Sequence, residues 1–223
     1  MTGSDKPIYE FRGPFGVPVQ IQPGVLLLFV IFLSFSGSPS DLVYDLIFVS
    51  LLVMSIFLHE VGHAWGCLIQ GIPVRRIVLH AGGGFCEHKR SPSPYENELI
   101  VAMGPIVNLV IWAVASMTWP LFGNGDLSWC VWVLSYINLF LAVLNLLPVH
   151  PLDGGKLFEL ALMRVLPPQT AHRISGGVGF VIALIWIPAM ILCFFTLGLV
   201  LFFIPSVSAH WEMMRGDDLR RRT

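Results

Sequence analysis

Long apolar runs are the feature that most limits what this chain can fold into. A helix that crosses a bilayer needs roughly 20 mostly apolar residues. The candidate runs are residues 19–35, 42–69, 99–119, 129–147 and 178–204. Because 55% of the residues are hydrophobic and only 12% are charged, the chain carries more apolar surface than a soluble domain can bury. The sequence therefore predicts an integral membrane protein.

We expect an all-α bundle of five or six transmembrane helices, forming one domain over residues 1–223 with a catalytic core at about 42–166. The first run contains Pro23 and Gly24 near its start. The last run contains Pro188, so one kinked helix and two short helices both remain open. The four cysteines have no metal-ligand spacing and are expected to be small buried residues.

Lysine and arginine in short loops indicate the side of the membrane on which those loops lie. Nine of them lie in the N-terminal tail, in residues 71–90 and after the fourth run: Lys6, Arg12, Arg75, Arg76, Lys89, Arg90, Lys156, Arg164 and Arg173. The loops at residues 36–41 and 120–128 contain none. This pattern predicts a multi-pass protein of the cell membrane with its N-terminus in the cytoplasm. The basic C-terminal tail favours the same side, which requires an even number of spans.

The loop at residues 71–90 differs from its neighbours. Val74, Ile77 and Val78 are β-branched, and a run of three glycines separates them from Phe85. These features favour a short β-hairpin on the cytoplasmic rim, and a flexible loop is the alternative. If it is a hairpin, we expect the edge that carries Ile77 and Val78 to receive an unwound substrate as an added strand.

The stretch HEVGH (59–63) places ionisable groups inside an apolar run, where they are costly and usually functional. On a helix, His59 and His63 share one face, and Glu60 lies beside them. That pattern suits one zinc ion with a glutamate acting on water. An ordinary amphipathic helix does not explain it, because the flanking residues are apolar.

A catalytic zinc usually has three protein ligands, so one more is needed. Asp153, within NLLPVHPLDGG (145–155), is the best candidate, although the same stretch also suits a surface turn. With the N-terminus in the cytoplasm, HEVGH, GPIVN (104–108) and Asp153 all fall in the cytoplasmic half of the membrane. They can therefore meet.

Together, these three stretches resemble the HExxH, GxxxN and NxxPxxxLDGG motifs of the site-2 protease family of intramembrane zinc metalloproteases, over roughly residues 50–158. The resemblance implies that His59, His63 and Asp153 bind one zinc ion per chain and that Glu60 is the catalytic base. It also implies that Asn145 holds the substrate or the transition state near the metal. For Asn108 the resemblance implies a role in close packing and in the polarity of the site, rather than in binding the metal. The PDZ and CBS domains that some members carry do not fit in this chain.

The resemblance implies hydrolysis of a peptide bond within or near a transmembrane segment of a protein substrate, in contact with the lipid bilayer. The net charge of −1 gives no reason to expect nucleic acid. A zinc carrier or sensor without hydrolysis is the alternative, but it would leave Glu60 without a purpose.

Several other side chains receive simpler interpretations from the sequence. His150 raises the question of a fourth, regulatory ligand, while His172 and His210 are expected to be solvated. The tryptophans near the outer ends of the third and fourth spans are expected to form an aromatic belt: Trp112, Trp119, Trp129 and Trp132.

Overall fold

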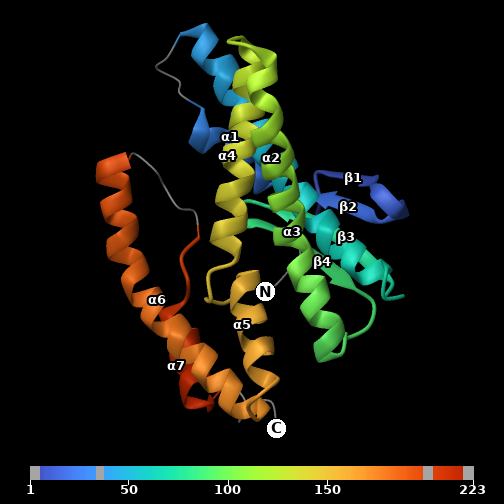
Figure 1. Ribbon diagram of the computed structural model, residues 1–223, viewed down its shortest axis with the longest axis vertical. Coiled ribbons are helices and arrows are strands. Elements are labelled where there is room, and N and C mark those ends of the chain that lie inside the picture. Colours follow the sequence, from blue (N-terminus) through green and yellow to red (C-terminus); the bar gives the residue numbers. More distant parts are fainter. Residues whose placement is uncertain (1–5, 34–37, 198–202, 218–223) are drawn as a thin grey trace. The chain divides into compact units, whose positions relative to one another are not determined.

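The computed structural model describes residues 6–33, 38–197 and 203–217. Its strands are β1 (Tyr9–Arg12), β2 (Pro18–Ile21), β3 (Val74–His80) and β4 (Gly83–His88). Its helices are α1 (Val25–Phe32), α2 (Pro39–Leu68), α3 (Pro94–Thr118), α4 (Asp126–Asn145), α5 (Asp153–Met163), α6 (Pro168–Leu197) and α7 (Val207–Arg215), as Figure 1 shows. The chain forms two compact units, Met1–Val143 and Leu144–Thr223, and each is described by itself.

Four helices in the described part of the chain are long and apolar enough to cross a membrane: α2, α3, α4 and α6. The structure is that of an integral membrane protein, but the predicted count of five or six spans is not confirmed. The first apolar run is divided between β2 and α1, and α1 has 8 residues, or roughly 12 Å of helix. Helix α6 continues through Pro188 to Leu197, and the rest of the last run includes residues 198–202, outside the described residues.

Helices α2 and α3 begin where capping residues place them. Ser93 precedes α3, and its hydroxyl accepts a hydrogen bond from the backbone of Glu96, whose carboxylate accepts one in return from the Ser93 N–H. Ser38 and Asp41 form the same reciprocal pair before α2. Such capping boxes satisfy backbone donors that have no helical partner. As a result α3 starts at Pro94, before the apolar run itself.

The four strands form one sheet in the order β1-β2-β3-β4. Strands β3 and β4 are antiparallel, which confirms the hairpin predicted in residues 71–90. Strands β1 and β2 were not predicted, and β2 pairs with β3 in parallel. Parallel strands need a crossover connection, which here consists of α1 and α2. The sheet packs on α2 through a core that includes Val19, Ala64, Cys67, Ile72 and Ile77.

Glycines allow α2 and α3 to approach closely in the first unit. A Cβ atom on Gly62 would lie 2.6 Å from the Met103 carbonyl oxygen, and one on Gly66 would lie 3.0 Å from the Ile100 Cα. Small residues at helix contacts are typical of membrane proteins, because packing and hydrogen bonds hold the helices together there. This contact sets α3 directly against the face of α2 that carries HEVGH.

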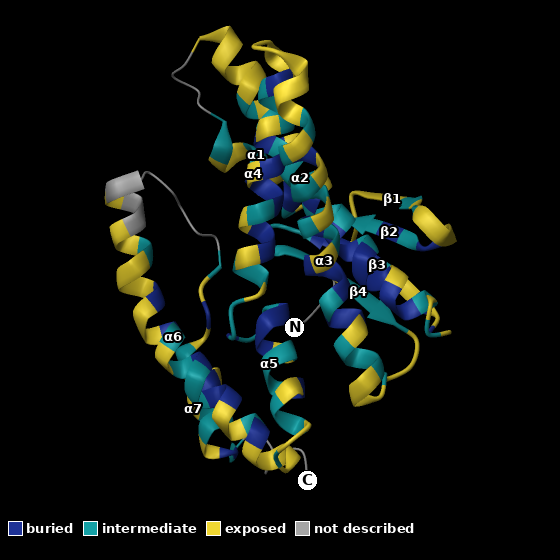
Figure 2. Ribbon diagram, in the orientation of Figure 1, coloured by how far each residue is buried: buried dark blue, intermediate teal, exposed yellow. Residues whose placement is uncertain are grey.

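The long helices carry many exposed residues, as the yellow segments of α3 and α6 in Figure 2 show, and many of these residues are apolar. On α6 they include Val181, Leu184, Ile185 and Leu192. Soluble monomers rarely expose contiguous apolar surface on this scale. A lipid environment accounts for these faces, in agreement with the apolar runs in the sequence.

Candidate metal centre

Helix α2 brings three of the predicted site residues together. His59 and His63 lie one helical turn apart, with their Nε2 atoms 3.1 Å from each other and their ring planes at 87°. Potential ligand atoms of His59, Glu60 and His63 all lie within 4.8 Å of one another. All three side chains are buried. The spacing in the sequence therefore produces a convergent cluster rather than a polar helix face.

The second nitrogen of each imidazole faces an oxygen atom supplied by α3. His63 Nδ1 lies 2.8 Å from the backbone oxygen of Ile100, and His59 Nδ1 lies 2.5 Å from Oδ1 of Asn108. Metal-binding histidines commonly donate their other N–H in this way, which leaves the lone pair of Nε2 for the metal. Asn108, which was expected to contribute packing and polarity, also contacts a predicted ligand directly.

Gly104, the first residue of GPIVN, leaves the space that the two imidazoles occupy. A Cβ atom at this position would lie 2.5 Å from His63 Nε2 and 2.7 Å from His59 Cε1. Both distances are too short for any side chain to fit without displacing the rings. The glycine of this motif therefore keeps α3 close to the two histidines and leaves their rings unobstructed.

Glu60 lies under strand β4. A Cβ atom on Gly84 would lie 2.6 Å from Cγ of Glu60 and 2.9 Å from its Oε1. The sequence indicated only that the three consecutive glycines punctuate a turn. In the structure Gly83 and Gly84 are part of the strand, and Gly84 is the point at which the backbone of β4 approaches the carboxylate.

The cluster fits zinc by its chemistry. It offers two neutral imidazole nitrogens about as far apart as two ligands of one tetrahedral ion, each with a second nitrogen held by an oxygen. Within the described residues, His59, Glu60 and His63 are the one group of three or more histidine, cysteine or acidic side chains so arranged. Two histidines leave room for a further ligand.

Asp153 and Asn145 belong to the second unit. Asn145 is the last residue of α4, and Asp153 is the first residue of α5 and only 6% exposed. A Cβ atom on Gly154 would lie 2.2 Å from the backbone of Leu146, and one on Gly155 would lie 2.7 Å from that of His150. The two glycines thus let the first turn of α5 pack against the preceding segment. The alternative of an exposed turn is not what the structure shows for Asp153.

The histidines of the second unit form a partly buried cluster, which corrects the expectation that His172 and His210 are solvated. Glu159 Oε1 lies 2.8 Å from His172 Nδ1, and its Oε2 lies 3.0 Å from His150 Nε2. The His150 backbone N–H donates to His210 Nε2 at 3.1 Å, and His210 is only 1% exposed. Burial would raise the pKa of Glu159, but hydrogen bonds from both histidines hold that pKa below its usual value. His150 is therefore engaged by Glu159 within its own unit.

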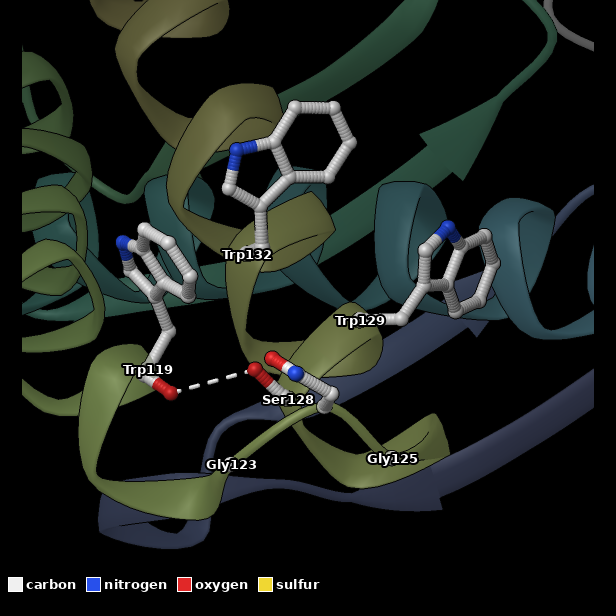
Figure 3. Close-up of a pocket in the computed structure, with 7 residues that line it drawn as sticks. Trp119, Gly123, Gly125, Ser128, Trp129 and Trp132 are labelled. Carbon is white, nitrogen blue, oxygen red and sulfur yellow. Dashed lines mark hydrogen bonds between the residues drawn. The ribbon is translucent and has the colours of Figure 1, made fainter.

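A surface hollow of about 330 Å³ lies beyond the C-terminal end of α3, where α3 connects to α4. Its lining includes Trp119, Trp129 and Trp132, and Figure 3 shows that their indole rings point in different directions rather than enclosing a common space. Such rings do not form a cage for a ligand. The arrangement agrees with the predicted aromatic belt.

Comparison with known proteins decides the family. The model of Peptidase family M50 matches residues 47–126 and 121–186, more than half of the chain, and these matches include HEVGH, GPIVN and Asp153. This chain belongs to peptidase family M50. The predicted resemblance to site-2 proteases is thereby confirmed. Curated relatives of this chain are named zinc metalloproteases, which agrees with the zinc that suits the cluster.

Two curated relatives and one solved structure illustrate the similarity of this M50 chain to known proteins. It is 27% identical over 171 residues to a zinc metalloprotease of Methanocaldococcus jannaschii, covering 76% of this chain and 50% of the relative. It is 31% identical over 137 residues to the stage IV sporulation protein FB of Bacillus subtilis, covering 56% of this chain and 43% of the relative. The chain thus spans about half the length of the curated relatives it matches.

The fold of this M50 chain is similar to that of the site-2 protease from Methanocaldococcus jannaschii. The TM-score is 0.66 at 22% sequence identity, and the match covers 96% of this chain and 95% of that one. At this level of identity the comparison shows a shared fold and nothing further.

Proposed function

We propose that this chain is an intramembrane zinc metalloprotease that hydrolyses a peptide bond within or near a transmembrane segment of a protein substrate. The observation that carries the proposal is the paired Nε2 atoms of His59 and His63, 3.1 Å apart with Glu60 beside them. These groups lie within α2, an apolar helix of 30 residues. Ionisable side chains at such a position are costly and are retained for function.

The ligand set that we propose is His59, His63 and Asp153, holding one zinc ion per chain. Asp153 is supported by its burial at the start of α5 and by the two glycines that let this turn pack closely. Zinc, when bound, polarises the scissile carbonyl and lowers the pKa of water to about 7. We place this site in a single membrane-embedded domain, with its core at about residues 42–166.

The remaining chemistry belongs to side chains of this chain. Glu60 accepts a proton from the attacking water and returns it to the leaving nitrogen, a role that requires a carboxylate beside the metal site. Asn145 is proposed to donate hydrogen bonds to the substrate near the scissile bond, because an amide can stabilise the negative charge that develops on the carbonyl oxygen. The apolar surroundings limit the access of water to the site.

We further propose that the substrate adds as a strand to β4. The edge expected from the sequence was wrong, because Ile77 and Val78 lie on β3, which is paired on both sides with β2 and β4. Among the described strands, β4 is terminal and passes directly over Glu60 at Gly84. An added strand satisfies the backbone of a substrate helix that has unwound, which would otherwise be left without partners in lipid.

Proline substitutions on β4 test strand addition, because proline cannot donate a hydrogen bond. Successive amides of a strand point in opposite directions, so Phe85→Pro and Cys86→Pro are both needed. The one whose amide points away from β3 should lower cleavage with zinc still bound. Glu10→Pro and Phe11→Pro on β1, the other terminal strand, are the matched controls. Normal cleavage by both folded β4 variants would exclude strand addition.

The proposed hydrolysis itself is tested with the purified chain and a labelled transmembrane peptide in lipid vesicles. Mass spectrometry should locate a cut within or close to the apolar segment of the peptide. Removing metal with a chelator should abolish the products, and zinc should restore them. Binding of zinc with no product from a panel of such peptides would favour the carrier or sensor instead.

A further inference from the structure

Three fully buried polar side chains form a connected chain of hydrogen bonds that ends at His59. They are Ser55 on α2, Asn108 on α3 and Asn138 on α4, each with no exposed surface. All lie in the first unit, and their neighbours along the helices are mostly apolar. A buried amide costs free energy unless its donors and acceptors are paired, so the pairing in this chain is informative.

The orientation of the Asn138 amide is set by two neighbouring oxygen atoms that can only accept a hydrogen bond from it. Its Nδ2 lies 2.9 Å from the backbone oxygen of Leu134 and 2.9 Å from Oγ of Ser55. The Ser55 hydroxyl donates its own proton to the Leu51 carbonyl at 2.8 Å, so towards Asn138 it accepts. The NH₂ group of Asn138 therefore faces these oxygens, and its Oδ1 is left to face Asn108.

That orientation is passed on to Asn108 and then to His59. Asn108 Nδ2 donates to Asn138 Oδ1 at 2.7 Å, and it also lies 3.4 Å from the Ser55 carbonyl oxygen. Its Oδ1 consequently faces His59 Nδ1, at 2.5 Å. Because an amide oxygen only accepts, Nδ1 carries the proton and Nε2 keeps the lone pair that a metal needs.

A reversed Asn108 amide would have the opposite effect. It would set its oxygen against those of Asn138 and Ser55 and present its NH₂ to His59 Nδ1. The imidazole would then carry its proton on Nε2, the atom that points to His63. His63 has no such dependence, since its Nδ1 faces the backbone oxygen of Ile100, which cannot be reversed.

We propose that Asn138, supported by Ser55, is a positioning residue that fixes the metal-binding tautomer of His59 through Asn108. This inference rests on the proposed zinc site. A buried asparagine pair also ties helices together. That packing role alone would not depend on which atom Asn108 presents to His59, and this difference allows the two roles to be separated.

The test is a double-mutant cycle in which zinc affinity of the purified full-length chain is measured by competition with a chelator. Asn138→Leu keeps the branched shape of the side chain but removes the amide, and it should weaken zinc binding by roughly 10-fold to 100-fold, the usual effect of losing an outer partner. In the background of Asn108→Asp, both carboxylate oxygens accept, so there is no orientation to fix. There Asn138→Leu should change zinc affinity by less than about 3-fold.

Ser135→Ala serves as a control, because Ser135 is another buried polar residue on α4 and lies outside the network. Ser55→Ala provides a milder second cycle if Asn138→Leu does not fold. It should lower zinc affinity by a smaller factor, and only in the background that retains Asn108. Its control is Ser50→Ala, which removes the same kind of hydrogen bond, from Ser50 Oγ to the Leu46 carbonyl, elsewhere on α2.

An equal loss of zinc affinity in both backgrounds would show that Asn138 acts through packing, and would overturn the inference while leaving the zinc site intact. Zinc affinity unaffected by either the Asn138 or the Ser55 substitution would also overturn it. Failure of the unsubstituted chain to bind zinc would instead overturn the proposed function, and the positioning role with it.

Discussion

At the scale of single residues, Asp153 is the member of the proposed ligand set that lies in the second unit. It is buried at the start of α5, where a carboxylate has little access to water. Removing a direct ligand should cost more than the roughly 10–100-fold that outer partners cost. We therefore predict that Asp153→Ala retains zinc at least about 100-fold less tightly than the unsubstituted chain, as measured by metal analysis after dialysis against graded chelator.

Asp126→Ala is the matched control for Asp153→Ala, because Asp126 also begins a helix, α4, and is exposed. It tests the general effect of losing an acidic side chain from a first helical turn. Full zinc occupancy in Asp153→Ala under conditions that strip no zinc from the control would mean that the third ligand lies elsewhere.

The residues of the metal site were predictable to the extent that they share one helix. The spacing of His59 and His63 implies their convergence, because the geometry of a helix fixes it. The hydrogen bonds that His59 and His63 donate to Asn108 and to the Ile100 carbonyl were not predictable, since they depend on the rotation of α3 against α2. Nothing in the spacing of GPIVN defines that rotation. The partly buried cluster around Glu159 was missed because it depends on how separate helices of the second unit, α5, α6 and α7, pack together.

At the scale of elements, the approach of β4 to α2 places a backbone directly against the proposed base. Gly84→Ala would introduce a Cβ atom 2.6 Å from Cγ of Glu60, so either the strand or the carboxylate must move. We predict that this variant binds zinc normally but cleaves at least about 10-fold more slowly, since small displacements of a catalytic group are costly. Zinc content and peptide cleavage are measured on the same sample.

Gly82→Ala is the control for Gly84→Ala, because Gly82 lies in the adjacent turn and its added Cβ would contact only the ring of His80, at 3.3 Å. Equal cleavage rates for the two variants would show that the contact between β4 and Glu60 has no bearing on catalysis.

Strands were harder to predict than helices. The hairpin in residues 71–90 was visible because β-branched residues and glycines occur side by side. Strand β2 was hidden, because Val19 and Ile21 run into the apolar residues of α1 and together resemble one membrane span. Its pairing partner, β3, is more than fifty residues further along the chain. Local patterns do not reveal such distant pairing.

At the scale of the whole molecule, the basic residues predict which side of the membrane each loop faces. The loop at residues 71–90 contains Arg75, Arg76, Lys89 and Arg90, which favour the cytoplasmic side for this loop. We predict that a single cysteine at Ser91, in a background without native cysteines, reacts with an impermeant reagent only from the cytoplasmic side. Labelling confined to the outer side would invert the proposed orientation.

The central claim is that the cluster on α2 hydrolyses peptide bonds within the membrane with Glu60 as the base. Glu60→Gln preserves the size of the side chain and removes only the proton acceptor. The most direct measurement determines zinc content and cleavage of a labelled transmembrane peptide for this variant and the unsubstituted chain side by side. We predict equal zinc content and a rate lower by roughly 10²–10⁴-fold, the usual contribution of a general base. Cleavage by zinc-loaded Glu60→Gln at the unsubstituted rate would contradict the account.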